Sequence, residues 1–352
     1  MKRREISLMN ALLCFQVIFV HVSSALLSRE AAGEWWYETL FALQYLFIYA
    51  VPGFVLLAGI KLGRKIARQE RFRYFPYLWG RIKRVTLPYL FWSAVYYVYL
   101  SWFSPRGGYP WELGTAVGYV LRGDMAAHFY FVPLIMQFYL LAPLWVYLIK
   151  RCRPELLCTA AALVTMCAQY IPAALAEFGV YFGSNDTLFP AYLLYWMLGL
   201  CIGCDYDRFC ARLAAHRPAL AVLAALAAGG YICIMRRQLG LGGENVPYGE
   251  SARILASAAL CTAVFALCLG ARGKRGPVLA AADGASYNVY LAHCLFLFLL
   301  EDHWTRTLAE PGIGEEFFLR FAAALLPAAA LSLGWYGIRR LMTRRRKELM
   351  RI

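Results

Sequence analysis

Long apolar stretches, separated by short polar segments, recur along the whole chain. Each stretch runs for about 17 to 24 residues, which is the length that a helix needs to cross roughly 30 Å of hydrocarbon. The pattern predicts ten membrane-spanning helices, at residues 6–27, 39–60, 85–103, 128–149, 156–175, 187–204, 219–235, 251–270, 284–301 and 317–338. We therefore expect an all-α integral membrane protein whose fold is a bundle of ten transmembrane helices.

The positive charges fall mainly on one side of this topology. If the N-terminus is cytoplasmic, the segments on that side carry 28 of the 36 Lys and Arg residues, and the loops on the other side carry six. Cytoplasmic loops are enriched in positive charge, and one missed or invented helix would invert every later loop. The bias thus predicts an even number of helices and places both termini in the cytoplasm.

Composition excludes most classes of soluble protein. Hydrophobic residues make up 61% of the 352 residues, and charged residues only 16%, whereas a soluble domain has about a quarter of its residues charged. The net charge of +15 follows from the bias of the loops, so nucleic acid is not an expected partner. We predict a single transmembrane domain over residues 1–338 and a basic cytoplasmic tail at 339–352 that interacts with membrane lipids.

The first apolar stretch has one alternative interpretation. A basic start and small residues at 23–25 resemble a signal peptide with its cleavage site. Asn10, Gln16 and His21 interrupt the apolar core, however, and cleavage would leave nine helices. A membrane-spanning helix is the preferred interpretation.

Two histidines are the first candidates for chemistry. An ionisable side chain at membrane depth is costly and tends to face a cavity or a partner, which selects His21 and His293. From the predicted ends of their spans, His21 lies about 22 Å and His293 about 13 Å from the cytoplasmic side, so we expect a difference in depth of about 9 Å. A structural hydrogen bond remains the alternative role for each.

The eleven cysteines predict no disulfide framework, because all of them fall in spans or cytoplasmic segments. Cys201 and Cys204 form a Cys-x-x-Cys pair, but no second pair and no nearby histidine accompany them. We therefore expect neither a zinc site nor a redox site, and interpret the cysteines as packing residues.

Five segments, in order along the chain, resemble the membrane-bound acyltransferase 3 family. They are REISLMNALLCFQVIFVHVSS (4–24), VPGFVLLAGIKL (51–62), RIKRVTLPYLFW (81–92), HFYFVPLIMQFYLLAPLW (128–145) and SYNVYLAHCLF (286–296). The third is the most specific, because an Arg-x-x-Arg pair runs into Leu-Pro-Tyr and a Trp. The ten-helix bundle usual in the family agrees with the number of predicted spans.

The resemblance implies transfer of an acyl group, commonly acetyl, from cytoplasmic acyl-CoA to a hydroxyl of an extracytoplasmic or lipid-linked glycan. It implies that His21 is the catalytic base and that Arg81 and Arg84, with Lys83 between them, bind acyl-CoA. Acyl-CoA is then a co-substrate, and neither a bound cofactor nor a metal is expected. The implied location is a bacterial-type cytoplasmic (plasma) membrane, with a role in modifying polysaccharides of the cell envelope.

Two positions depart from the family pattern. The arginine that usually stands eleven residues before the histidine, on the same helix face, is Asn10 here. Asparagine can form hydrogen bonds but supplies no positive charge. The usual serine of the Ser-Gly element is Ala58, before Gly59. The chain is a divergent member, and whether these replacements abolish activity stays open at this point.

The remaining candidates follow from the chemistry of acyl transfer. A neutral histidine suits the base that takes the proton of the attacking hydroxyl. His293 could orient His21 or bind the acceptor, and Asn10 is a further supporting candidate. Asn288, Tyr290 and Gln137 are polar side chains in predicted spans that could donate to a developing oxyanion.

The segment 61–84 carries nine Lys and Arg residues, which suit the phosphates of CoA. For the cluster as a whole, positive-inside topology and attraction to anionic lipids are the better explanation. Arg81 and Arg84 differ, because an α-helix would place them one turn apart on one face beside the third span.

An integral-membrane O-acyltransferase is thus the leading interpretation. A transporter or flippase of a lipid-linked glycan or small solute is the alternative, but it usually needs carboxylates at membrane depth. No Asp or Glu lies near the middle of any predicted span. A catalytically inactive scaffold of a polysaccharide-synthesis complex is the third interpretation.

Overall fold

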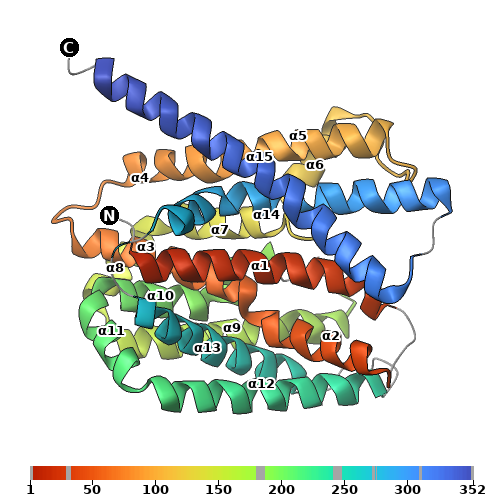
Figure 1. The fold of residues 1–352 in the computed structure, drawn as a ribbon. Coiled ribbons are helices and arrows are strands. Elements are labelled where there is room, and N and C mark those ends of the chain that lie inside the picture. Colours follow the sequence, from red (N-terminus) through yellow and green to blue (C-terminus); the bar gives the residue numbers. More distant parts are fainter. Residues whose placement is uncertain are drawn as a thin grey trace. The chain divides into compact units, whose positions relative to one another are not determined.

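The computed structural model describes residues 3–28, 33–179, 187–240, 248–271, 274, 276–308 and 311–349. Every regular element within these ranges is a helix (Figure 1). The chain divides into two compact units. Unit 1 comprises Met1–Gln44, Phe91–Glu112 and Ala271–Ile352, and unit 2 comprises Tyr45–Leu90 and Leu113–Gly270.

The helices of unit 1 are α1 (Arg4–Leu27), most of α2 (Trp35–Leu46), the larger part of α5 (Leu87–Trp102), α14 (Pro277–Thr307) and α15 (Ile313–Leu349). Those of unit 2 are η1 (Phe47–Tyr49), α3 (Ala50–Ala67), α4 (Tyr74–Arg81), the π-helical turn η2 (Ile82–Thr86), α6 (Leu113–Arg122), α7 (Phe131–Leu140), α8 (Ala142–Arg151), α9 (Pro154–Ala176), η4 (Phe189–Tyr192), α10 (Leu193–Cys204), α11 (Tyr206–Ala215), α12 (Arg217–Gly240), α13 (Gly249–Cys268) and η5 (Leu269–Ala271).

Each of the ten predicted stretches coincides with a helix or with consecutive helices. By length and composition, five are able to cross a membrane: Arg4–Leu27, Trp35–Ala67, Arg217–Gly240, Gly249–Ala271 and Ile313–Met342. The pair α7 and α8, bent by 56°, would be a sixth. The described part of the chain is therefore all-helical, with five or six candidate membrane spans. The count of ten spans and the cytoplasmic location of both termini stay predictions, and residues 350–352 of the predicted tail lie outside the described residues.

In unit 1, α1 and α14 run side by side in the same direction. Asn10 of α1 contacts Ser286 of α14. Further along both helices, His21, eleven residues after Asn10, contacts His293, seven residues after Ser286. The last helix, α15, returns in the opposite direction and crosses the other two obliquely (Figure 1). Two ring contacts show the reversed order: Phe15 with Phe321, and Phe19 with Phe317. These directions are the ones that the predicted topology requires of the first, ninth and tenth spans.

A buried ionic network joins α5, α14 and α15 beyond the predicted end of the ninth span. Asp302 accepts hydrogen bonds from three side chains: Tyr99 and Ser104 at 2.6 Å, and Arg106 at 2.9 Å. Burial alone would raise the pKa of Asp302, but these donors lower the pKa below its ordinary value. Arg320 pairs with Glu316 at 2.8 Å and also with Glu301. The charges within these apolar helices are therefore compensated by partners.

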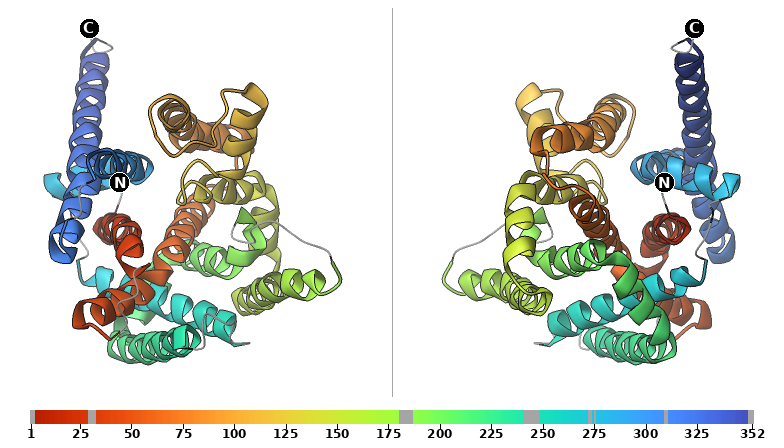
Figure 2. Two further views of the ribbon diagram at one scale, coloured as in Figure 1. Left: turned by 90° about the vertical axis from the view of Figure 1, so that its right-hand side faces the viewer. Right: turned by 90° about the vertical axis from the view of Figure 1, so that its left-hand side faces the viewer.

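In unit 2, α3 and α10 pack with their backbones in direct contact, and α12 packs beside α13 (Figure 2). Gly59 and Gly63 of α3 face Gly199 and Gly203 of α10. A Cβ atom added at any of the four would meet a backbone carbonyl oxygen of the opposite helix, well inside contact distance. Small residues four positions apart allow this close approach of membrane helices. The Gly59 predicted to belong to a family motif thus has a packing role.

Candidate functional site

One polar cluster of the site lies between the N-terminal halves of α1 and α14. Asn10 Nδ2 donates a hydrogen bond to Asp283 Oδ1 at 3.0 Å and another to Ser286 Oγ at 2.7 Å. Ser7 Oγ donates to Asp283 Oδ2 at 3.0 Å. Ser7, Asp283 and Ser286 are all buried. We call these four residues the Asp283 cluster, which fixes the rotation of α1 against α14.

The cluster contains Asp283, which the sequence pattern placed outside the ninth span, in a cytoplasmic segment ending at residue 283. Helix α14 begins at Pro277, seven residues before the predicted start at 284, so Asp283 lies within the helix. The hydropathy pattern stops at this carboxylate, although the helix continues. Pro277 was the available signal, because proline is favoured at the first position of a helix.

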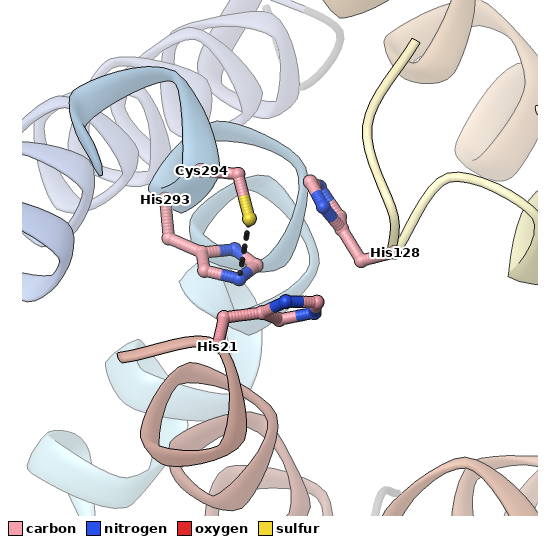
Figure 3. A group of neighbouring side chains, drawn as sticks. All are labelled: His21, His128, His293 and Cys294. Carbon is pink, nitrogen blue, oxygen red and sulfur yellow. Dashed lines mark hydrogen bonds between the residues drawn. The ribbon is translucent and has the colours of Figure 1, made fainter. Parts of the chain in front are cut away.

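His21 of α1 and His293 of α14 contact each other further along the two helices than the Asp283 cluster. Their ring centroids are 5.3 Å apart, and the ring planes are tilted by 50° (Figure 3). The expected difference in depth of about 9 Å is therefore wrong. The early start of α14 explains the error, because seven more residues add about 10 Å of helix below His293. His293 is fully buried, whereas His21 is half-buried.

The hydrogen bonds of His293 define which ring nitrogen carries the proton. Nδ1 lies 2.7 Å from the backbone oxygen of Tyr290, which can only accept, so Nδ1 is the protonated nitrogen. Nε2 then presents a lone pair, and Cys294 Sγ lies 3.3 Å from it. The thiol donates to this nitrogen. Sequence reasoning missed Cys294, although it directly follows the candidate histidine.

The other supporting candidates have different surroundings. The ring centroid of Tyr290 is 6.1 Å from that of His293, and the residue's backbone oxygen holds the histidine. Asn288 lies about 140° around α14 from His293, and its side chain forms no hydrogen bond with another described residue. The side chain of Gln137, in unit 2, is hydrogen-bonded to the backbone. Its Nε2 donates to the Thr187 carbonyl oxygen at 2.7 Å, and its Oε1 accepts from the Phe189 N–H at 3.1 Å.

The predicted acyl-CoA residues lie in unit 2, at the junction of α4 and η2. The Arg81 guanidinium lies 5.0 Å from the ring centroids of both Tyr77 and Tyr139. Burial alone would lower the pKa of Arg81, but the two phenol oxygens raise it, so the arginine keeps its charge. Lys65 Nζ lies 5.0 Å from the same Tyr77 ring. Two cations therefore converge on one aromatic side chain.

Arg81 and Arg84 do not share one α-helical face as expected, because a π-helical turn spans Ile82–Thr86. The wider turn rotates the two arginines further apart than an α-helix would, and such turns are frequent at functional sites. Arg84 and Lys83 are exposed, and Lys83 Nζ lies 4.8 Å above the ring of Trp79. None of these three cations forms an ion pair with an acidic residue among those that the structure describes.

Comparison with known proteins agrees with the resemblance of the five segments. The model of a family described as "Acyltransferase domain" matches residues 3–336. A protein of Bacillus subtilis (strain 168), named "Putative membrane-bound acyltransferase YfiQ", is 24% identical over 361 residues, which cover 96% of this chain and 93% of that protein. No solved structure gives a significant match.

The family match extends over the helices that carry the Asp283 cluster, both histidines and the cations of α4 and η2. Several of its helices are long and apolar enough to span a membrane. The chain belongs to the acyltransferase 3 family, and it is a multi-pass membrane-bound acyltransferase that transfers groups other than aminoacyl groups.

Proposed function

We propose that this protein transfers an acyl group, acetyl in the first instance, from cytoplasmic acyl-CoA to a hydroxyl of an extracytoplasmic or lipid-linked glycan, with His21 as the general base. The observation that carries the proposal is the pairing of His21 with His293 between two packed apolar helices. Histidines at such a position are costly to bury and are typical of functional sites.

The chemistry requires one base beside the attacking hydroxyl. As the hydroxyl oxygen attacks the thioester carbonyl, its proton passes to a ring nitrogen of His21. The C–S bond then breaks, the acyl group stays on the acceptor as an ester, and CoA leaves as a thiol after taking up the proton. His21 is half-buried and so open to a substrate, whereas the buried His293 acts as a positioning residue.

The acyl donor needs cations for its phosphate groups. Lys83 and Arg84 are exposed and have no described acidic partner, so both are available to an anion. Arg81 is held by two tyrosine rings, and little conformational entropy is lost when it binds. These residues make the π-helical turn and the end of α4 the proposed CoA site.

The contacts of Asn10 favour an active enzyme over an inactive scaffold. Its amide and the Ser7 hydroxyl together satisfy the two carboxylate oxygens of Asp283. The replacement of the family arginine therefore leaves the contact between α1 and α14 intact, and with it the arrangement of His21 and His293.

Sealed inverted membrane vesicles containing the protein provide the test. Label from radioactive acetyl-CoA is expected in the glycan or lipid fraction, and not in vesicles that lack the protein. If label stays with CoA for both acetyl and longer acyl donors, in vesicles that retain their native acceptors, the proposal is wrong.

The CoA site makes a separate prediction. Arg84→Ala is expected to raise the KM for acyl-CoA by about tenfold or more with little change in kcat, because a hydrogen bond to a charged group contributes about 1.5–3 kcal/mol. Arg71→Ala removes another exposed arginine of the segment 61–84 and is the matched control. Equal KM values for the two variants would show that Arg84 does not belong to the CoA site.

A further inference from the structure

Two imidazoles and one thiol converge between α1 and α14. His21, His293 and Cys294 each offer one ligand atom, and these atoms lie within 4.8 Å of one another. Figure 3 shows the three side chains pointing toward a common point. We infer that they form a binding site for Zn²⁺, and that Zn²⁺ bound there inhibits acyl transfer by occupying His21.

The orientation of His293 suits a metal ligand. Metal-binding histidines almost always donate their second ring N–H to a carbonyl or carboxylate, which fixes the tautomer and raises the basicity of the ligating nitrogen. His293 does this through Nδ1 and the backbone oxygen of Tyr290, so Nε2 offers its lone pair on the side of the thiol.

The set of donors selects the class of ion. Mg²⁺ and Ca²⁺ prefer oxygen ligands, whereas imidazole together with thiolate suits Zn²⁺. Three protein ligands are enough for a zinc site in which one tetrahedral position is open to another ligand. On binding, the S–H proton of Cys294 is released, a Zn–S bond forms, and both imidazoles donate lone pairs. No group is oxidised or reduced.

The two helices hold these ligands in place before any ion arrives. The Asp283 cluster fixes α1 against α14 on one side of the site, and Tyr96 Oη of α5 donates to the Leu291 carbonyl of α14 at 3.2 Å. His293 and Cys294 are 0% and 4% exposed. His21 is half-buried, so it is the ligand of the three with the most exposed surface.

Inhibition rests on the proposed function, but metal binding does not. A lone pair of His21 committed to Zn²⁺ is not available to accept the proton of the acceptor hydroxyl. Zinc should therefore suppress transfer in the intact protein, and a chelator should restore it.

The test uses the full-length protein in detergent, with Co²⁺ as a spectroscopic probe and Zn²⁺ for affinity. We expect a sulfur-to-cobalt charge-transfer band together with the visible bands of tetrahedral Co²⁺. Loss of a residue that only hydrogen-bonds a metal ligand weakens metal binding by about 10- to 100-fold. Loss of a direct ligand in Cys294→Ala should therefore weaken Zn²⁺ binding by more than about 100-fold and abolish the sulfur band. His21→Gln should weaken Zn²⁺ binding from the other helix.

The matched control is Cys261→Ala, which removes a buried thiol from α13 of unit 2 and should leave both signals unchanged. Melting curves and size-exclusion profiles establish that each variant is folded. A missing sulfur band in the intact protein, or an equal band in Cys294→Ala, would overturn the inference.

Transfer assays separate the site from its proposed effect. Loss of transfer on adding Zn²⁺, relieved in Cys294→Ala, supports inhibition through this site. Full transfer by protein that shows the cobalt band contradicts the inhibitory role. Absence of transfer from any acyl-CoA by metal-free protein counts against the proposed function, and the cobalt and zinc data still decide the site.

Discussion

His21→Ala is expected to lower the kcat of acyl transfer by about 10²- to 10⁴-fold, which is the usual contribution of a general base. The side chain lies against His293 on the face of α1 that the Asp283 cluster turns toward α14. Its removal therefore leaves the attacking hydroxyl without a proton acceptor while α1 and α14 remain joined. The measurement is transfer of label from saturating acetyl-CoA in vesicles with equal amounts of each protein.

His216→Ala is the matched control, because this histidine lies at the end of α11, where Nδ1 is 2.9 Å from the Arg212 carbonyl. Its transfer rate should stay within a factor of two of the unmodified protein. If His21→Ala retains most of the activity, the base lies elsewhere and the histidine pair is structural. A lower melting temperature of His21→Ala with unchanged kcat would give the same conclusion.

The pairing of His21 with α14 shows which features of the site the hydropathy pattern can predict. The pattern located both helices, and the cost of histidine at membrane depth selected both residues. Asp283 caused the error in depth, because a carboxylate ends an apolar window. Its acceptance into α14 depends on Ser7 and Asn10, which lie more than 270 residues earlier in the chain. A local pattern contains no information about partners at that separation.

Features that depend on side-chain rotamers or on local backbone winding were not predictable. The approach of Cys294 to His293 Nε2 requires two neighbouring side chains to turn toward each other, which sequence spacing does not express. The π-helical turn after Arg81 likewise has no signature in the hydropathy pattern. The family motif located the arginines of this segment but not their different surroundings.

The glycine contact between α3 and α10 predicts the largest effect on stability. Gly199→Ala is expected to lower the free energy of unfolding by about 3 kcal/mol or more, the upper end of the cost of overpacking a core. The added methyl group would meet the Leu56 carbonyl oxygen, which belongs to rigid helix backbone and not to a side chain that can turn away. The two helices must separate, so contacts along their whole length weaken. Folded yield and melting temperature in detergent measure the effect.

Gly229→Ala is the control that makes this result specific, because the same methyl group is added to a helix of the same unit. A Cβ atom at Gly229 of α12 has nothing within 4 Å, so the substitution meets no steric obstacle. Alanine is a better helix former than glycine by about 0.8–1.0 kcal/mol, and Gly229→Ala should therefore be neutral or stabilising. If Gly199→Ala destabilises the protein while Gly229→Ala is neutral or stabilising, the loss of stability arises from the contact between α3 and α10. Equal effects at the two positions would show instead that helix propensity dominates and that the backbones of α3 and α10 are not in contact.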